Sequence, residues 1–383
     1  MADFNSNNSK VGLVLSGGGA RGAYQAGVMK AVTEIAAAGE KSLPISIITG
    51  ISAGAINTAF MASTWNDPVK SCKDLVDTWA RLETDNIFRT DAVSLGHIGA
   101  RWLADTALGS FRKRKHAHAL LDTQPLRELL STNVPVERIQ EQINKGHLEA
   151  AAITAMDYST SNSITFVQAR DGIKLWDRNR RESHHAKITV EHVMASSAIP
   201  LFFPSVKVGD KYFGDGCLRN TAPLSPAIHL GADKLIVVSV RRPDHLAPVV
   251  STKPSDEPSI ARVLGVMMNA VLLDAIEVDM ERMARVNNTL KSVPPHLLKE
   301  MSLRPVEYLW IRPSQDIGAL AAGKFNKLPK LMRYLIGGLG GSGESSELTS
   351  YLLFDPEYCG KLIELGYLDA MNSKDEIKRF LAA

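Results

Sequence analysis

The chain has 383 residues, of which 45% are hydrophobic and 22% charged, so it is long and apolar enough to fold around a sizeable core. The net charge of +3 is too small to indicate a nucleic-acid-binding protein, and the sequence contains no zinc-finger or RNP-like string. Three widely separated cysteines, Cys72, Cys217 and Cys359, argue against a disulfide framework and suit a reducing compartment.

The sequence carries no targeting or metal-binding pattern. Residues 1–10 are polar and lack an apolar core, so we expect no secretory signal peptide. The sequence contains no run of eighteen uninterrupted apolar residues, so we expect no transmembrane helix, and the expected location is the cytoplasm. Neither C-x-x-C nor H-E-x-x-H occurs, so we expect no metal and no other cofactor.

The first sixty residues repeat one order of elements. Residues 11–15 and 45–48 are apolar runs that predict strands, and each leads through a glycine-rich turn into a helical pattern, over residues 23–38 and from Ala53 onward. This order is typical of an α/β protein with an open parallel sheet, which binds its ligands at the carboxyl edge where both turns would lie. That edge is the predicted active site.

The first turn, residues 17–22, reads Gly-Gly-Gly-Ala-Arg-Gly. It fits the dinucleotide pattern G-x-G-x-x-G, but that site also needs an acidic residue at the end of the second strand, and Thr49-Gly50 stands there. The competing interpretation is an oxyanion hole, in which backbone amides of consecutive glycines point at the carbonyl oxygen under attack.

The second turn, residues 50–54, reads Gly-Ile-Ser-Ala-Gly. This string places a serine on a tight turn between strand and helix, with glycines that let the backbone and substrate approach. Ser52 would then lie at a helix N-terminus, whose partial positive charge favours a developing oxyanion. The pentapeptide alone is weak evidence, and its flanking turn gives it weight.

Two later stretches complete a recognisable set. Asp215-Gly216 follows Tyr-Phe-Gly at residues 212–214, and residues 195–204 read Ala-Ser-Ser-Ala-Ile-Pro-Leu-Phe-Phe-Pro. With the two glycine-rich turns, these four ordered elements resemble the patatin-like phospholipase family of lipid acyl hydrolases. The resemblance implies a three-layer α/β/α fold with a mostly parallel central sheet.

The resemblance also implies roles for individual residues. The nucleophile falls on Ser52, the general base on Asp215, and the oxyanion donors on the amides of Gly18 and Gly19. Arg21 matches the family's basic position beside the hole; it would either hold the loop or meet a phosphate. The remaining motif positions are Gly17, Ala20, Gly22, Gly50, Gly54 and Gly216.

Two positions depart from the family pattern. Ser16 stands where plant-type members often have aspartate, and Cys217 stands where glycine or alanine is usual. Neither departure removes a reacting group. Cys217 would alter the packing behind Asp215 or simply fill space as a small, semi-apolar side chain.

A serine hydroxyl needs an adjacent base near neutral pH, and in most serine hydrolases that base is histidine. No histidine here sits in a recognisable motif, whereas Asp215 matches the family's base in a Ser–Asp dyad. A carboxylate suffices if burial raises its pKa and the glycine amides stabilise the transition state. Spacing alone leaves five histidines as candidates: His97, His184, His185, His192 and His245.

The middle of the chain contains a segment of weaker periodicity. After a helix that Asp67-Pro68 opens, residues 85–133 carry scattered large apolar side chains. The segment is either a lid over the substrate or a set of ordinary surface helices. Its basic run, within residues 111–116, is either a solvated face or a contact for anionic lipid head groups.

Further strands and hairpins follow by pattern. We predict a helix over residues 122–130, a buried strand over 150–156, and a helix from Thr189 toward Pro200. Asp171-Gly172 would form the turn of one hairpin, and the second strand of another hairpin would lead into Asp215. The predicted strands after residue 160 are 163–168 and 173–176, 205–208 and 211–213, 235–240, and 306–311.

The last third of the chain is predicted to be largely helical. A long helix covers residues 260–286, residues 319–335 form a basic amphipathic pattern, and residues 337–343 read as a flexible glycine-rich link. The amphipathic stretch either contacts the inner membrane surface or packs on the main domain. We expect a catalytic domain over residues 1–313 and a helical extension over 314–383.

The predicted function is hydrolysis of carboxylic esters in phospholipids, lysophospholipids or related acyl lipids through an acyl-enzyme. The alternative is an acyltransferase or thioesterase that uses the same serine on acyl-CoA or acyl-carrier thioesters. The partner is an acyl-lipid substrate, and no nucleic acid is expected. The sequence gives no signal for the oligomeric state.

Overall fold

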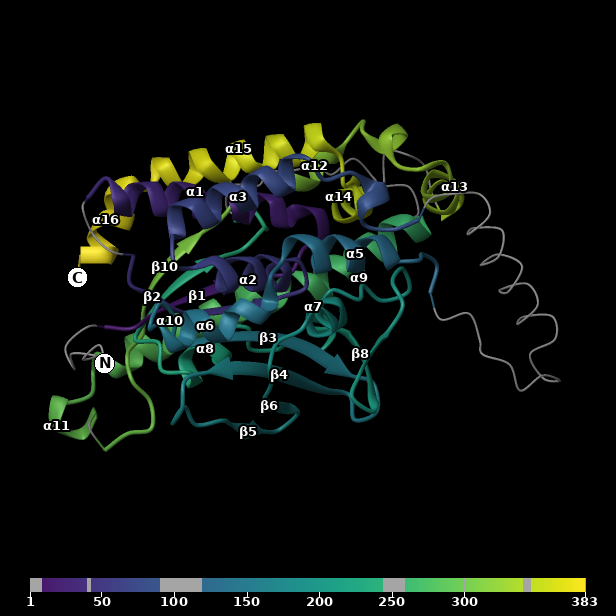
Figure 1. Ribbon diagram of the computed structural model, residues 1–383. Helices are drawn as coiled ribbons and strands as arrows, with labels where there is room; N and C mark the ends of the chain where they lie inside the picture. The colour runs from purple at the N-terminus through teal and green to yellow at the C-terminus, as the bar shows by residue number, and fades with distance from the viewer. Residues whose placement is uncertain are drawn as a thin grey trace.

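The computed structural model describes residues 9–39, 43–89, 119–243, 259–298, 300–339 and 346–382. Within these ranges one sheet runs through the molecule with helices on both faces (Figure 1). Its main path is β10 (Glu307–Ile311), β9 (Lys234–Val238), β1 (Val11–Leu15), β2 (Ile45–Ile51), β3 (Ala150–Asp157), β4 (Asn162–Ala169), β6 (Arg181–His185) and β5 (Asp177–Arg178); β8 (Lys211–Asp215) pairs with β3, and β7 (Val206–Val208) with β8.

The strand directions divide the sheet into two parts. From β10 to β3 every neighbouring pair is parallel. Beyond β3 the sheet is mixed, because β4 and β8 both pair with β3 in the antiparallel sense. The predicted α/β fold with a mostly parallel sheet is confirmed.

Alternating side chains on the inner strands build the two helical layers. Leu13 and Leu15 of β1 belong to the larger hydrophobic cluster, whereas Val14 between them belongs to a second cluster on the other face. The second cluster packs against α8 (Ser225–His229) and α10 (Asp274–Leu290). A strand buried on both faces reads as a continuous apolar run, which is why β1 and β9 are visible in the sequence.

Most helices contribute to the larger cluster. They are α1 (Gly22–Ala37), α2 (Ala53–Thr64), α3 (Pro68–Ala80), α5 (Gln124–Asn133), α6 (Ile139–Asn144), α7 (Val190–Ser196), α9 (Ile260–Leu272), α12 (Ile317–Ala321), α13 (Lys330–Leu339), α14 (Ser346–Leu352), α15 (Pro356–Asn372) and α16 (Lys374–Ala382). A short helix, α11 (Pro295–Leu298), precedes β10.

The C-terminal helices pack on the N-terminal ones. In Figure 1, α15 lies along α1, and the two helices are in direct contact. Tyr24 of α1 donates to Asp369 of α15 over 3.1 Å, and Tyr367 donates to Glu34 over 2.8 Å. Residues of the predicted extension therefore complete a helical layer of the predicted catalytic domain. The domain boundary at residue 313 stays a prediction.

The predicted hairpin of residues 163–168 and 173–176 is wrong in its second half. Gly172 does form a turn, with φ of 85°, but residues 173–176 belong to no strand. Both edges of β4 are already occupied, by β3 and by β6, so no edge remains for residues 173–176. The hairpin at this place joins β5 to β6.

Two predicted helices are divided. The helix over 260–286 breaks at Leu273, whose φ of −120° leaves the helical range, so α9 and α10 are separate. The amphipathic stretch 319–335 splits into α12, a 3₁₀ turn η6 (Phe325–Lys327) and α13, because Gly323 takes a φ of 76° and Pro329 cannot continue a helix. Residues 337–339 of the predicted link lie inside α13.

The structure describes only one of the two regions that were proposed for membrane contact. Lys324 and Lys327 of the 319–335 stretch pair with Glu357 of α15, so their ammonium groups are engaged within the protein. The basic run in 111–116, and residues 90–118 of the predicted lid, lie outside the described residues. Across the described ranges, no helix combines the length and apolar character required to cross a bilayer.

Candidate active site

Ser52 stands on a strained turn between β2 and α2. Ile51 is the last residue of β2 and Ala53 the first of α2, and Ser52 between them has φ of 55° and ψ of −125°. A non-glycine residue in such a conformation costs on the order of 1–3 kcal/mol and persists only where its surroundings fix it. Ser196 accepts a hydrogen bond from the Ser52 amide over 3.0 Å, and Ser197 donates to the Ser52 carbonyl over 3.0 Å.

Asp215 reaches Ser52 through the strand register. It is the last residue of β8, and the antiparallel pairing of β8 with β3 sets it opposite Ala155, one strand away from β2. The Ser52 Oγ donates to the Asp215 Oδ2 over 2.6 Å, although the two residues are 163 positions apart. The two residues predicted to react are thus in direct contact.

The surroundings of Asp215 alter its acidity. The side chain is fully buried, and this burial raises its pKa to about 6 by penalising the charged form. The Ser52 hydroxyl and the Cys217 amide, 2.9 Å from Oδ1, oppose the shift because both donate to the carboxylate. A carboxyl group with this pKa is ionised at neutral pH but accepts a proton more readily than an exposed aspartate.

The glycine loop links β1 to α1 through the 3₁₀ turn η1 (Gly19–Arg21). Within the described chain, no backbone carbonyl accepts a hydrogen bond from the amides of Gly18 and Gly19, so both remain able to donate. Gly19 has φ of 57°, and a Cβ there would lie 2.3 Å from the carbonyl oxygen of Tyr351. Only glycine fits this position.

The loop and the serine turn lie side by side. A Cβ on Gly17 would stand 3.1 Å from the Cβ of Ser52, and one on Gly54 would stand 2.3 Å from the carbonyl oxygen of Leu15. The end of β1 therefore touches the start of α2. The other predicted motif residues are also buried in this region: Ala20 in η1, Gly22 at the start of α1, Gly50 in β2, and Gly216 at the start of the 3₁₀ turn η4 (Gly216–Leu218).

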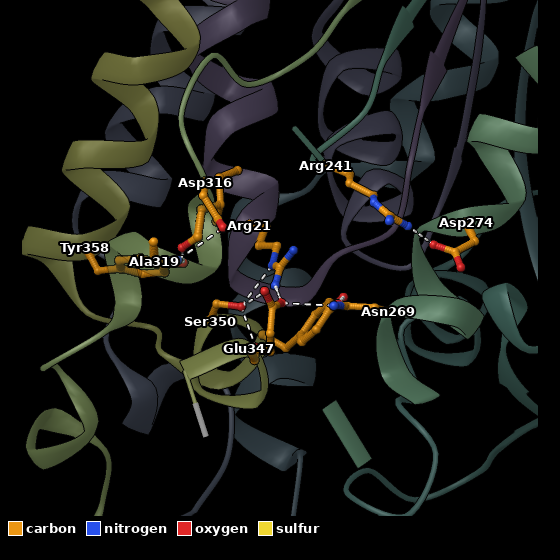
Figure 2. A network of polar contacts seen from close by, with 11 residues as sticks. Arg21, Arg241, Asn269, Asp274, Asp316, Ala319, Glu347, Ser350 and Tyr358 are labelled. Atoms are coloured by element: carbon orange, nitrogen blue, oxygen red, sulfur yellow. Dashed lines mark hydrogen bonds and ion pairs between the residues drawn. The ribbon is translucent and has the colours of Figure 1, made fainter. Parts of the chain in front are cut away.

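Arg21 points toward α14, where it meets Glu347 and Ser350 (Figure 2). Its Nη2 donates to Glu347 over 2.6 Å and to Ser350 over 2.6 Å, its Nε also donates to Ser350, and its guanidinium stacks 4.2 Å above the Tyr351 ring. The whole residue is only 3% exposed. Of the two roles predicted for Arg21, this geometry favours holding the loop.

An apolar cavity opens beside Ser52 and contains about 630 Å³ of space, part of it open to solvent. Ser52, Ile56 and Phe60 line it at a spacing of four residues, so it follows α2 for two turns, about 12 Å. The other lining residues are mostly apolar: Gly19, Ala53, Leu75, Thr78, Trp79, Leu82, Ile87, Leu126, Leu129, Leu130, Asn133, Val134, Ser197, Ile199, Phe203 and Phe354. This apolar lining is suited to contact with a hydrocarbon chain.

The histidines in the described ranges do not bond to Ser52. His192, the buried one, bonds through Nδ1 to Thr189 and packs edge-on against Phe166, and burial lowers its pKa to about 4. His97 and His245 lie outside the described residues. The described residues also include no group of three or more His, Cys, Asp or Glu side chains arranged to hold a metal ion.

Sequence reasoning missed several residues that shape this site. Ser196 and Ser197 lie in the stretch that resembles the family, but the pattern gives no hint that they bond the backbone of Ser52. Glu347 and Ser350 sit in a helix with no recognisable motif, more than 320 positions from Arg21. No local signal in the sequence reveals these long-range contacts.

Comparison with known proteins gives one family match. The family model described as patatin-like phospholipase matches residues 13–228, more than half of the chain. No curated protein matches the chain.

The solved structures that are similar to the chain include three at low sequence identity. VipD from Legionella pneumophila is 13% identical, with 96% of this chain and 67% of that chain covered and a TM-score of 0.36. Human GIVD cytosolic phospholipase A2, in complex with methyl gamma-linolenyl fluorophosphonate, is 9% identical, with 98% and 58% covered and a TM-score of 0.44. The type III effector protein ExoU is 16% identical, with 90% and 77% covered and a TM-score of 0.29. The chain thus spans about two thirds of VipD and less of the human enzyme.

Proposed function

This chain belongs to the patatin-like phospholipase family, and from that premise we propose that it is a serine lipid acyl hydrolase with Ser52 as nucleophile and Asp215 as general base. The observation that carries the proposal is the 2.6 Å hydrogen bond to a buried carboxylate from Ser52, which lines an apolar cavity. The substrate is a carboxylic ester whose acyl chain enters that cavity.

The first half of the reaction forms an acyl-enzyme. The Ser52 Oγ attacks the ester carbonyl carbon while Asp215 accepts the hydroxyl proton. The amides of Gly18 and Gly19 donate to the oxyanion that forms, and donors of this kind are each worth roughly 3–4 kcal/mol elsewhere. Collapse of the tetrahedral intermediate expels the alcohol, which takes the proton from Asp215 and leaves Ser52 acylated.

The second half returns the enzyme to its starting state. A water molecule attacks the acyl carbonyl and gives a proton to Asp215. The second tetrahedral intermediate collapses, the fatty acid leaves, and the Ser52 oxygen recovers its proton from Asp215. Because Asp215 must be ionised to accept the first proton, kcat/KM should fall as pH drops below about 6, the pKa of Asp215.

Acyl transfer from a thioester is the second candidate, since the same serine and cavity would accept an acyl-CoA chain. Membership of the patatin-like phospholipase family favours an ester of a lipid over a thioester. Rates with matched oxygen esters and acyl-CoA of equal chain length would separate the two activities.

The experiment that tests the proposed function measures fatty-acid release from p-nitrophenyl esters and from phosphatidylcholine or lysophosphatidylcholine by the full chain. Ser52→Ala and Asp215→Asn should each lose at least about a thousandfold in kcat, as expected when a member of a catalytic unit is removed. Ser71→Ala and Asp279→Asn alter buried residues of the same types away from the pair and should retain activity. Hydrolysis by Ser52→Ala at the wild-type rate would exclude the mechanism.

A further inference from the structure

A closed ring of contacts surrounds the Arg21 guanidinium (Figure 2). Arg21 donates to Glu347 and Ser350 of α14, and Asn269 of α9 donates to the same carboxylate oxygen of Glu347 over 3.2 Å. The Tyr351 hydroxyl donates to Asn269 over 2.5 Å, and its ring lies under the guanidinium. Arg21, Glu347, Asn269 and Tyr351 thus form a closed cycle of contacts, and Ser350 accepts two further hydrogen bonds from Arg21, so the whole network fixes the guanidinium in one place.

The ring is attached directly to the glycine loop. Arg21 is the last residue of η1, and its amide donates to the carbonyl of Gly18 over 3.1 Å. On the other side, the carbonyl of Tyr351 leaves no room for a side chain on Gly19. α14 therefore touches the loop at both ends of η1, through the guanidinium and through its own backbone.

We propose that Glu347 and Ser350 are positioning residues for the oxyanion hole, acting through Arg21. With Tyr351 they form what we call the α14 clamp, which holds the amides of Gly18 and Gly19 in line with the carbonyl that Ser52 attacks. This role rests on the proposed function. It assigns a catalytic purpose to α9 and α14, which both lie outside the family match over residues 13–228.

The placement of Arg21 argues against direct contact with a lipid phosphate. Its Nε and Nη2 are both engaged by α14, its side chain is buried, and it is not among the residues that line the cavity. Freeing it for a phosphate would break an ion pair with Glu347 and leave that carboxylate without its guanidinium partner. The clamp therefore acts on the loop rather than on the substrate head group.

The clamp should affect the rate of the chemical step more than substrate binding. Complete loss of one oxyanion donor lowers kcat by roughly 10²–10³-fold, so a loop that samples displaced positions should lose somewhat less. Acyl-chain binding depends on the cavity, which Gly19 lines but Arg21, Glu347 and Ser350 do not, so it should change little. A loss in kcat with KM nearly constant is the signature of an interaction used in the transition state.

The test compares Glu347→Ala and Ser350→Ala with Thr349→Val, a buried position on the same helix outside the ring. For a neutral p-nitrophenyl ester and for a phosphatidylcholine, we expect both clamp variants to lose roughly ten- to a hundredfold in kcat with nearly unchanged KM. Thr349→Val should match the wild type. Hydrogen–deuterium exchange of the peptide containing residues 17–21 should be faster in both clamp variants, and this readout requires no activity.

Two results would overturn the clamp. Wild-type kcat and wild-type exchange in both folded variants would reduce the ring to ordinary packing. A KM increase confined to the phosphate-bearing lipid would instead assign Arg21 to the head group.

An inactive wild type would refute the proposed function alone, and the exchange measurement would still decide whether α14 holds the loop. Ser350→Ala keeps the Arg21–Glu347 pair and guards against a Glu347→Ala chain that does not fold.

Discussion

At the scale of the residue, Asp215 is held in a state that favours reactivity over stability. A carboxylate with no exposed surface is costly, and its partners are a serine hydroxyl and a backbone amide rather than a positive charge. The result is a pKa of about 6 instead of 3.8. A base of this strength can take a proton from Ser52 and return it to a leaving alcohol.

The raised pKa predicts that removing the charge stabilises the fold. The folded state binds the Asp215 proton more tightly than the unfolded state does. The stability of the fold therefore falls as the pH rises from about 4 to 6, and the whole loss of stability persists at higher pH. A shift of this size corresponds to about 3 kcal/mol. Asp215→Asn should therefore unfold at higher urea concentration than the wild type at pH 8. The difference between the two midpoint urea concentrations should disappear toward pH 4.

The control for this prediction is Ser52→Ala, which keeps the buried carboxylate. This variant should still lose stability as the pH rises, over a range that extends to higher pH because the Ser52 hydroxyl no longer donates to Asp215. An Asp215→Asn protein that is less stable than the wild type at pH 8 would contradict the assignment. So would a stability difference that stays constant from pH 8 to pH 4, because it could not arise from titration of this carboxyl group.

At the scale of the element, sequence patterns predict individual strands and helices but not which strands pair with each other. The apolar runs of β1, β2 and β9 are visible because these strands are buried on both faces. The sequence of β4 does not reveal its partners, because no residue in the strand indicates that β3 pairs with one edge and β6 with the other. The contact of Ser52 with Asp215 depends on such a pairing, of β8 with β3, and the sequence suggests it only through the family resemblance.

The cavity follows the same rule. Ile56 and Phe60 are visible as an apolar helical stripe on α2, a pattern that equally fits an ordinary core face. That α3 and α5 leave space over this stripe is a property of packing, which no single helix encodes. The acyl chain length that the enzyme accepts should therefore be set by side chains on several elements.

Ile56→Phe tests this shared cavity. The larger ring, one turn along α2 from Ser52, should obstruct a long acyl chain and leave a short one unaffected. We expect kcat/KM for dodecanoyl and longer p-nitrophenyl esters to fall at least about tenfold relative to the butanoyl ester, a discrimination that a hydrophobic pocket readily supplies. Ile143→Phe adds the same volume in α6 outside the cavity and should keep the wild-type chain-length profile. An equal loss for all chain lengths in Ile56→Phe would place the acyl chain elsewhere.

At the scale of the whole molecule, the candidate site draws on distant parts of the chain. The glycine loop and Ser52 come from the first sixty residues, Asp215 from the middle, and Glu347 and Ser350 from the last forty. Figure 1 shows the same arrangement in the helical layer, where α15 lies along α1. A catalytic unit limited to residues 13–228 would lack the helices that hold Arg21, so the C-terminal helices are expected to be required for full activity.

The most direct measurement of the central claim is the site and rate of covalent labelling by an alkyl fluorophosphonate, followed by intact-mass and peptide mass spectrometry. The reaction needs the nucleophile, its base and the oxyanion donors at once. We predict a single adduct on Ser52 in the wild type, no adduct in Ser52→Ala, and labelling of Asp215→Asn slowed by at least about a hundredfold. An adduct on another residue, or equal labelling rates for the wild type and Asp215→Asn, would contradict a Ser52–Asp215 dyad.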